Sequence, residues 1–216
     1  MEIFRREMGP LSTNSYVVSI GKSCIVIDPG FPKESVELAE FILERKLKVE
    51  YIIATHGHFD HVLGVDKLRE RLGYKPKFYI HIGDINLLAK AGEALNHFFG
   101  VYVNPPKPDV YLYGGERFTL NGLVLEVIHT PGHTKGSICI YIENEKIMFT
   151  GDTLFRGSIG RFDFPESDEN LMRRSLQKLA SMDPQIRIYP GHGNESTLKN
   201  ELEFNEPFRD MLGLIP

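Results

Sequence analysis

The 216-residue sequence is poor in cysteine, with only Cys24 and Cys139. Two cysteines cannot build the disulfide framework of a small secreted protein, and both lie in apolar, strand-like runs. We therefore expect two small buried hydrophobic residues in a cytoplasmic protein. No stretch approaches the roughly 20 consecutive apolar residues of a transmembrane helix. No secretory signal is visible in residues 1–10.

An excess of positive charge is also missing. Lys and Arg number 25 against 29 Asp and Glu, which gives a net charge of −4. Proteins that bind nucleic acid or anionic lipid carry basic patches, so this balance argues against both kinds of partner. The length and the 42% hydrophobic content are typical of a single globular domain with a sizeable core, here residues 1–216.

Apolar periodicity predicts two similar halves, each with sheet strands, helices and a buried strand that ends in a histidine loop. In the first half we expect strands at Glu2–Met8, Ser15–Ile20, Cys24–Asp28, Tyr51–Ala54 and Lys77–His81, and helices at Lys33–Leu47 and Val65–Leu72. In the second half we expect strands at Arg117–Leu120, Leu123–His129, Ser137–Ile142, Lys146–Thr150 and Gln185–Tyr189, and helices at Asp168–Met182, capped by Ser167 or Asp168, and at Thr197–Phe204.

Residues 83–115 between the halves are less regular. A short helix is expected around Ile85–Lys90, followed by an aromatic and proline-rich stretch. Two strand-and-helix units packed sheet to sheet, with their helices outside, form a four-layer sandwich. The sequence therefore predicts an α/β fold of the αββα type.

Histidine placement carries the chemistry. Three of the eight histidines fall in His56-Gly57-His58-Phe59-Asp60-His61, directly after a predicted buried strand. Imidazole and carboxylate groups are good zinc ligands, and the i, i+2 spacing suits a loop folded around a metal. The alternative is a polar loop without ligands. Six residues cannot surround one ion with all four side chains, so the motif indicates two adjacent metals.

Further ligands are expected where other strands end. His133, Asp152 and His192 each follow a glycine in a loop after a predicted strand. Glycine permits the tight backbone turn that a crowded site requires. Each loop taken alone could be an ordinary turn, but together they supply the ligands that two metals still need.

Four motifs, His-x-His-x-Asp-His, Thr-Pro-Gly-His-Thr, Thr-Gly-Asp-Thr-Leu-Phe and Pro-Gly-His-Gly, occur in this order. This series resembles the metallo-β-lactamase superfamily and, within it, the glyoxalase II (hydroxyacylglutathione hydrolase) group. True β-lactamases and the nucleases of the superfamily resemble the chain less closely. The resemblance implies the αββα sandwich and two metal sites with these ligands: His56, His58 and His133 on one metal, Asp60, His61 and His192 on the other, and Asp152 as a bridge.

The same resemblance implies a dinuclear hydrolase of a small-molecule thioester, for example S-lactoylglutathione or another glutathione conjugate, acting through a metal-bound hydroxide. Two divalent ions, zinc first and iron or manganese as alternatives, would lower the pKa of the shared water. Asp60 and Asp152 would be the catalytic residues that orient the hydroxide and accept its second proton. No dedicated acid is visible, which suits a thiolate leaving group.

Substrate recognition is less defined. The stretch after His192 is too short for the helical C-terminal region that binds glutathione carboxylates in the family, so we expect a short form without it. Arg161 is the best remaining carboxylate ligand, with structural pairing to Asp163 as the alternative, and Arg156 is a second candidate. The aromatic stretch Phe98–Tyr113 is expected to be a pocket wall, a contact within a homo-oligomer or core packing.

Two other functions fit parts of the pattern. Persulfide dioxygenases with one iron resemble this branch, share the first motif and have a run similar to Gly160–Phe164. A non-catalytic interaction module with a structural metal is the third, although three protein ligands and a bridge imply an open catalytic position. Of the remaining histidines, we expect His129 to support the site or pack, His81 to be structural, and His97 to lie at the surface or line the pocket.

Overall fold

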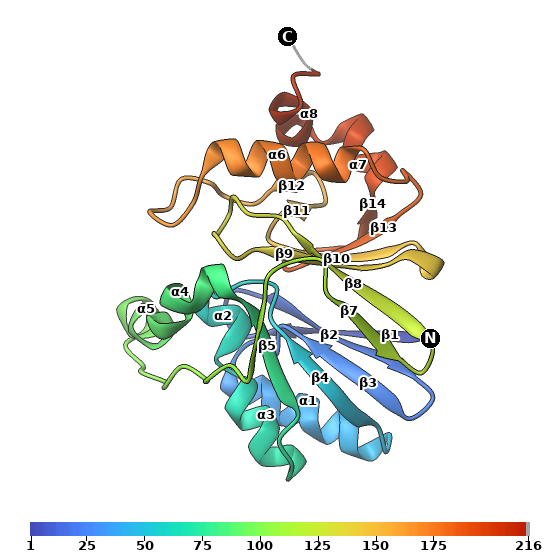
Figure 1. The fold of residues 1–216 in the computed structure, drawn as a ribbon. Helices are drawn as coiled ribbons and strands as arrows, with labels where there is room; N and C mark the ends of the chain where they lie inside the picture. Colours follow the sequence, from blue (N-terminus) through green and yellow to red (C-terminus); the bar gives the residue numbers. More distant parts are fainter. Residues whose placement is uncertain (215–216) are drawn as a thin grey trace.

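The structure is a computed structural model that describes residues 1–214 and contains two β-sheets packed face to face (Figure 1). The first sheet has the strand order β1 (Glu2–Met8), β2 (Thr13–Ile20), β3 (Ser23–Ile27), β4 (Lys48–Ile53), β5 (Lys77–His81) and β6 (Val110–Leu112). The second has the order β14 (Ser196–Thr197), β13 (Arg187–Pro190), β10 (Ile147–Gly151), β9 (Ile138–Ile142), β8 (Leu123–His129) and β7 (Arg117–Leu120).

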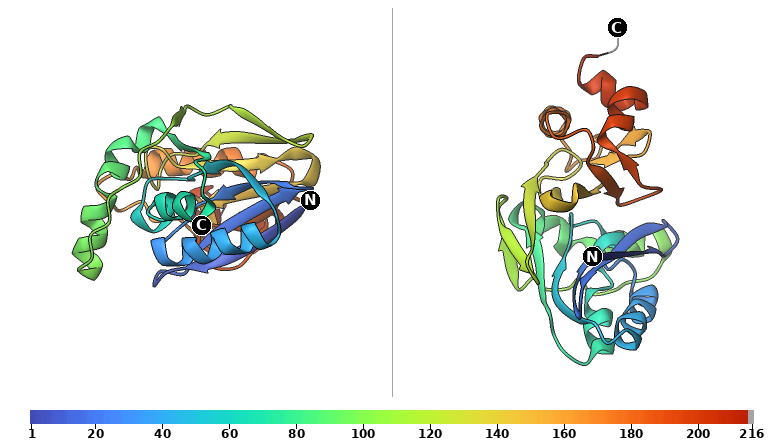
Figure 2. Two further views of the ribbon diagram at one scale, coloured as in Figure 1. Left: turned by 90° about the horizontal axis from the view of Figure 1, so that it is seen from below. Right: turned by 90° about the vertical axis from the view of Figure 1, so that its right-hand side faces the viewer.

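Helices cover the outer face of each sheet (Figure 2). The helices α1 (Pro32–Glu44) and α3 (Val65–Leu72) lie against the first sheet, and α6 (Glu169–Ala180) and α7 (Leu198–Phe204) lie against the second. The last helix, α8 (Glu206–Met211), packs on α6 and α7. At one end of the first sheet lie α2 (Phe59–Val62), α4 (Ile85–Ala89) and α5 (Ala91–Phe99). This arrangement confirms the predicted four-layer αββα sandwich.

Apolar side chains fill the interfaces between these layers. Leu38 of α1 and Ile52 of β4 belong to the cluster under the first helical layer, whereas Ile27 and Ile140 belong to the cluster between the sheets. Met172 of α6 belongs to the cluster under the second helical layer. Strands buried on both faces explain the continuous apolar runs in the sequence.

The structure corrects the expectation for several short elements. Residues 83–115 contain α5 and β6 in addition to the predicted short helix, and α8 follows the last predicted helix. A two-stranded hairpin, β11 (Leu154–Phe155) and β12 (Ser158–Ile159), had no clear signal. Cys24 and Cys139 are fully buried, as predicted. None of the helices described between residues 1 and 214 is long and apolar enough to cross a membrane.

The chain order places the histidine loops at one edge of the sandwich. The strand β4 leads into the His56 motif, and β8 leads into the loop with His133. The parallel neighbours β10 and β13 end side by side, so the loops that carry Asp152 and His192 emerge together. Carboxyl ends of adjacent parallel strands commonly form ligand sites.

Candidate metal centre

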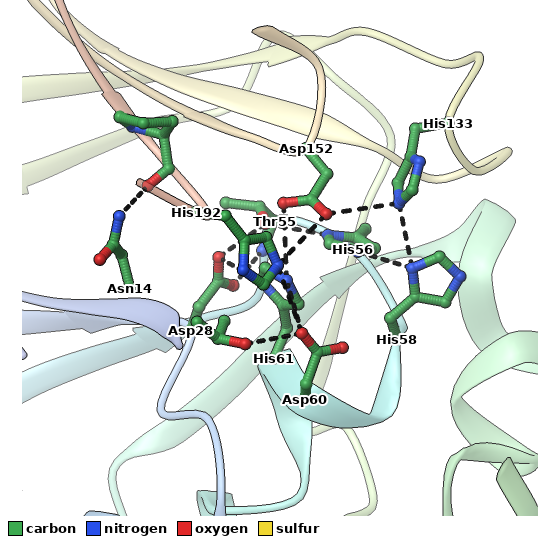
Figure 3. A network of polar contacts seen from close by, with 12 residues as sticks. Asn14, Asp28, Thr55, His56, His58, Asp60, His61, His133, Asp152 and His192 are labelled. Atoms are coloured by element: carbon green, nitrogen blue, oxygen red, sulfur yellow. Dashed lines mark hydrogen bonds and ion pairs between the residues drawn. The ribbon is translucent and has the colours of Figure 1, made fainter. Parts of the chain in front are cut away.

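Figure 3 shows that the predicted ligand residues converge on one centre. They come from loops of both halves of the chain. Among residues 1–214, three overlapping groups have nitrogen and oxygen atoms that lie within 4.8 Å of one another. Their members are His56, His58 and His133; Asp60, His61 and His192; and His56, His61 and Asp152. All seven residues of the predicted ligand set are therefore brought together.

The first cluster consists of three imidazole rings, from His56, His58 and His133. His56 Nε2 lies 2.9 Å from His58 Nδ1, and His133 Nε2 lies 3.0 Å from the same His58 Nδ1. His56 and His58 precede α2 in the first half of the chain, whereas His133 comes from the second half. The cluster therefore depends on how the two halves dock.

The second cluster contains a carboxylate and two imidazoles. Asp60 and His61 lie on the short helix α2, and the His61 ring packs against that of His56 with centroids 4.1 Å apart. Asp60 Oδ2 is 3.5 Å from His61 Nε2 and 3.4 Å from His192 Nε2. Thr13 donates a hydrogen bond of 2.6 Å to the same oxygen, which fixes the carboxylate.

Asp152 lies between the two clusters. Its Oδ2 is 3.6 Å from both His133 Nε2 and His192 Nε2, which belong to different clusters. Its Oδ1 is 3.6 Å from His61 Nε2. One carboxylate thus faces both clusters, which is the position that a bridging ligand requires.

Two buried atoms at this centre have no hydrogen-bond partner among the described residues: His61 Nε2 and Asp152 Oδ1. His61 is fully buried, and Asp152 is 8% exposed. An unsatisfied buried polar atom costs roughly 1–3 kcal/mol, and such atoms are rare in native proteins. Cations in contact with these atoms would remove that cost. The nitrogen and oxygen donors suit a divalent metal such as zinc or iron, so the residues fit a dinuclear site.

Each clustered histidine donates a hydrogen bond from the ring nitrogen that points away from the centre. The ring nitrogen that faces the centre then carries no proton and can bind a metal. Such hydrogen bonds fix the ring orientation and tautomer of metal-ligating histidines. The acceptors are Thr55 Oγ1 for His56 (3.2 Å), Glu166 Oε1 for His58 (3.0 Å), Asp28 Oδ2 for His61 (3.0 Å), the Arg161 carbonyl for His133 (2.8 Å) and the Leu11 carbonyl for His192 (3.1 Å).

The electrostatic field differs between the clusters. Burial lowers the pKa of His61, but the surrounding carboxylates of Asp60, Asp152 and Asp28 outweigh it and raise that pKa to about 10. Burial lowers the pKa of His56 well below its usual value, and the neighbouring histidines lower it further. The carboxylate-rich cluster attracts positive charge, which favours the binding of cations.

Asp28 and Thr13 are among the supporting residues that the sequence analysis missed. Asp28 follows β3, and its carboxylate accepts hydrogen bonds from the backbone N–H and the hydroxyl of Thr55, both of 2.7 Å, besides the bond from His61. Thr13 begins β2 and holds Asp60. A polar residue at the end of an apolar strand was the available signal for Asp28, but the Asp-Pro-Gly sequence is equally typical of a turn.

Glycine is required where backbone passes close to the ligands. A Cβ atom on Gly191 would lie 2.2 Å from Asp152 Oδ1 and 2.9 Å from His61 Cε1. A Cβ atom on Gly160 would lie 1.7 Å from the carbonyl oxygen of Asp152. Only glycine fits at these two positions without displacing Asp152.

The predicted substrate residues lie around the centre rather than in it. The exposed guanidinium of Arg161 donates to both Asp163 oxygens at 2.9 and 2.8 Å and stacks 4.2 Å from the Phe164 ring centroid. Phe164 in turn packs against the rings of His58 and His133. Arg156 is exposed and follows Phe155, whose ring packs against His192. Both arginines therefore remain candidates.

The other three histidines lie outside the clusters. His81 stacks on His129 with ring centroids 4.0 Å apart, and His129 donates to the carbonyl of Lys135. This pair joins the ends of β5 and β8. His97 is exposed on α5. Beside it, Phe98 is 67% exposed and stacks on Phe59 of α2.

Comparison with known proteins agrees with this geometry. The family model described as the Metallo-beta-lactamase superfamily matches residues 8–192. Hydroxyacylglutathione hydrolase GloC of Haemophilus influenzae is 35% identical over 196 residues, which cover 87% of each chain. The crystal structure of TTHA1623 in a di-iron-bound form is similar with a TM-score of 0.83 at 37% identity, covering 94% of this chain and 98% of that one. The BLEG-1 B3 metallo-beta-lactamase is similar with a TM-score of 0.86 at 30% identity, covering 95% and 98%.

Proposed function

The chain belongs to the metallo-beta-lactamase superfamily and is a metal-dependent hydrolase, and on this premise we propose that it hydrolyses thioesters of the hydroxyacylglutathione type with two divalent metal ions. The observation that carries the proposal is the position of Asp152. Its carboxylate faces nitrogen atoms of both clusters, and its Oδ1 has no other partner among the described residues.

The residues of each cluster have distinct tasks in this proposal. His56, His58 and His133 would hold one ion, Asp60, His61 and His192 the other, and Asp152 would contact both. When bound, the ions would make water nucleophilic near neutral pH and polarise the substrate carbonyl. The zinc pair is our first choice, and iron is the alternative favoured by the di-iron form of TTHA1623.

Asp60 would orient the attacking water molecule. Burial opposes its charge, but His61, His192 and the Thr13 hydroxyl hold the pKa of the carboxyl far below its usual range. Asp60 therefore stays ionised and can orient a water molecule by accepting its hydrogen bond. Thr13 prevents the carboxylate from rotating away.

The lack of a free proton donor favours a thioester. Among the described residues of the two clusters, each histidine N–H is already donated to an oxygen. No group of the clusters is left to protonate a poor leaving group such as an amine. A thiolate, whose thiol has a pKa of roughly 8.5, can leave near neutral pH without being protonated. The name of the GloC relative points to the same substrate class.

Arg161 would contact a carboxylate of the substrate. Its exposed guanidinium stacks on Phe164, and the Phe164 ring packs against His58 and His133 of the first cluster. The bond to Asp163 must then open or be shared when substrate binds. Arg156 is the second candidate. We propose a small-molecule partner, such as a glutathione conjugate, and neither nucleic acid nor membrane.

A substrate panel with purified protein tests this proposal. S-lactoylglutathione should be hydrolysed by protein loaded with about two zinc ions per chain, and H58A and D152N should each reduce kcat/KM to background while the fold is retained. H97A is the matched control, because this exposed imidazole lies outside the clusters and should leave kcat/KM unchanged.

The other outcomes identify the alternatives. Oxygen uptake with glutathione persulfide by protein that contains one iron would replace the hydrolase by a persulfide dioxygenase. Hydrolysis of a cephalosporin without thioester turnover would replace the thioesterase by a β-lactamase activity, as in the name of BLEG-1. Retained activity in D152N would refute the ligand assignment.

A further inference from the structure

A buried carboxylate outside both clusters links the loops of the first cluster. Asp84 ends the 3-10 turn Ile82–Asp84 after β5 and is 1% exposed. Its Oδ2 accepts hydrogen bonds from the Gly57 N–H (2.8 Å) and the Thr134 hydroxyl (2.7 Å). Its Oδ1 accepts from the Gly136 N–H at 2.6 Å. One side chain thus holds two loops that come from different halves of the chain.

The packing around Asp84 is tight. A Cβ atom on Gly136 would lie 2.6 Å from Asp84 Cγ, and one on Gly57 would lie 3.1 Å from Asp84 Cβ. A Cβ atom on Gly83 would lie 2.8 Å from the Lys135 carbonyl oxygen. Glycine at three points therefore lets both loops approach the carboxylate closely.

The chemistry of the three donors requires a carboxylate. An ionised Asp accepts hydrogen bonds at both oxygens and donates none, so it can bind all three groups at once. Thr134 is held from its other side as well, because Ser137 Oγ accepts from the Thr134 N–H and lies 2.8 Å from its hydroxyl. A buried carboxylate is costly unless its hydrogen bonds are complete, so the three bonds form together.

The two loops held by Asp84 carry neighbouring ligands. Gly57 lies between His56 and His58, and Thr134 directly follows His133. The distance of 3.0 Å between His58 Nδ1 and His133 Nε2 therefore depends on the position of these loops. In the second cluster, His61 is held by a different carboxylate, Asp28, which also accepts from Thr55 beside His56.

We propose that Asp84 is a positioning residue that sets the separation of His58 and His133 and thereby the metal affinity of the first cluster alone. The inference rests on the proposed assignment of the clusters as two metal sites. Asp84 binds the loops of His58 and His133 and makes no hydrogen bond to the second cluster. Its loss should therefore affect the first metal site and spare the second.

Zinc titration against a chromophoric chelator tests the proposal. Asn at position 84 turns one acceptor into a donor. D84N should therefore lower the affinity for one of the two zinc ions about 10- to 100-fold and leave the affinity for the other unchanged. D28N should weaken the binding of both ions, because Asp28 holds His61 and also Thr55, which accepts from His56. Long-range ¹H–¹⁵N spectra of the histidine rings identify the site, since D84N should change the zinc response of His58 and His133, and D28N that of His56 and His61.

A milder pair of variants guards against misfolding of D84N. T134V removes the hydroxyl that donates to Asp84 and should weaken the same zinc ion, whereas T134S keeps the hydroxyl and should restore wild-type affinity. Equal loss at both sites in D84N, or wild-type affinity in D84N and T134V, would overturn the proposal. Selective zinc loss in a protein without thioester turnover would support the role of Asp84 and refute the proposed function instead.

Discussion

At the scale of single residues, the centre depends on glycines without a side chain as much as on its ligand residues. Gly191 precedes His192 and passes so close to Asp152 that a methyl group would overlap Oδ1. We predict that G191A displaces Asp152 and lowers zinc affinity at least about 10-fold, because both clusters share this carboxylate. Isothermal titration of metal-free protein with zinc measures the loss.

Gly193 provides the control for this substitution. Its φ of 75° is left-handed, and a Cβ atom there would meet nothing within 4 Å. G193A should cost about 1 kcal/mol in unfolding free energy through backbone strain and leave zinc affinity unchanged. If G193A lowered zinc affinity as much as G191A, backbone conformation rather than contact with Asp152 would explain the effect.

The side chains that converge on the centre could be selected from the sequence where the signal was local. The ligand-type side chains of the first motif lie within six positions, and a strand and a glycine precede each of the other three. Asp28 and Asp84 carry no such signal, since each acts on a loop 27 residues away along the chain. Only the folded chain shows that these two carboxylates are buried and which donors they bind.

At the scale of elements, α6 holds the His133 loop in place. Ser167 donates to the carbonyl of His133, Ser175 donates to that of Pro131, and the Asp168 N–H donates to that of Gly132. A Cβ atom on Gly132 would lie 2.3 Å from Met172 Cα, so helix and loop are in direct contact. The start of α6 is therefore part of the support of the metal centre.

The N-cap of α6 gives an element-scale prediction. The structure selects Asp168 from the two predicted cap residues, because its Oδ1 accepts from the Leu171 N–H at 2.9 Å. D168A should lower the unfolding free energy by about 1 kcal/mol, whereas D168N keeps an acceptor and should stay close to wild type. Urea unfolding followed by circular dichroism measures both. Equal stability of D168A and wild type would contradict the assigned cap.

Most of the elements that sequence patterns failed to predict are short, apart from the nine-residue α5. The strand β6 has only three residues, and α8 only six, with Asn205 as its cap and Pro207 in its first turn. Segments of this length have little intrinsic stability. The helix α8 forms because Phe208 and Met211 are buried in the cluster under the second helical layer. Contacts distant in sequence, rather than local periodicity, determine such elements.

At the scale of the whole molecule, the centre lies where the two halves of the chain meet. Direct contacts already join them there, because Tyr16 and Asn14 of β2 both donate to the carbonyl of Pro190 on β13 at 2.7 and 2.9 Å. The apolar clusters between the layers contain none of the ligand residues. The fold should therefore persist without metal, with reduced stability where Asp60, Asp152 and Asp28 surround His61.

Metal removal tests this division between fold and centre. Ligand binding to the native state alone stabilises it by about 4 kcal/mol when the free ligand is at 1,000 times its Kd. For a chain of this size each kcal/mol corresponds to roughly 2–4 °C in Tm, so chelation should lower Tm by at least roughly 8 °C while the far-ultraviolet circular dichroism at 25 °C stays unchanged. Zinc should restore Tm in the wild type but not in D152N, whose bridging carboxylate is lost. Loss of the dichroism signal on chelation would mean that the ions hold the halves together, and an unchanged Tm would mean that the clusters bind no ion tightly.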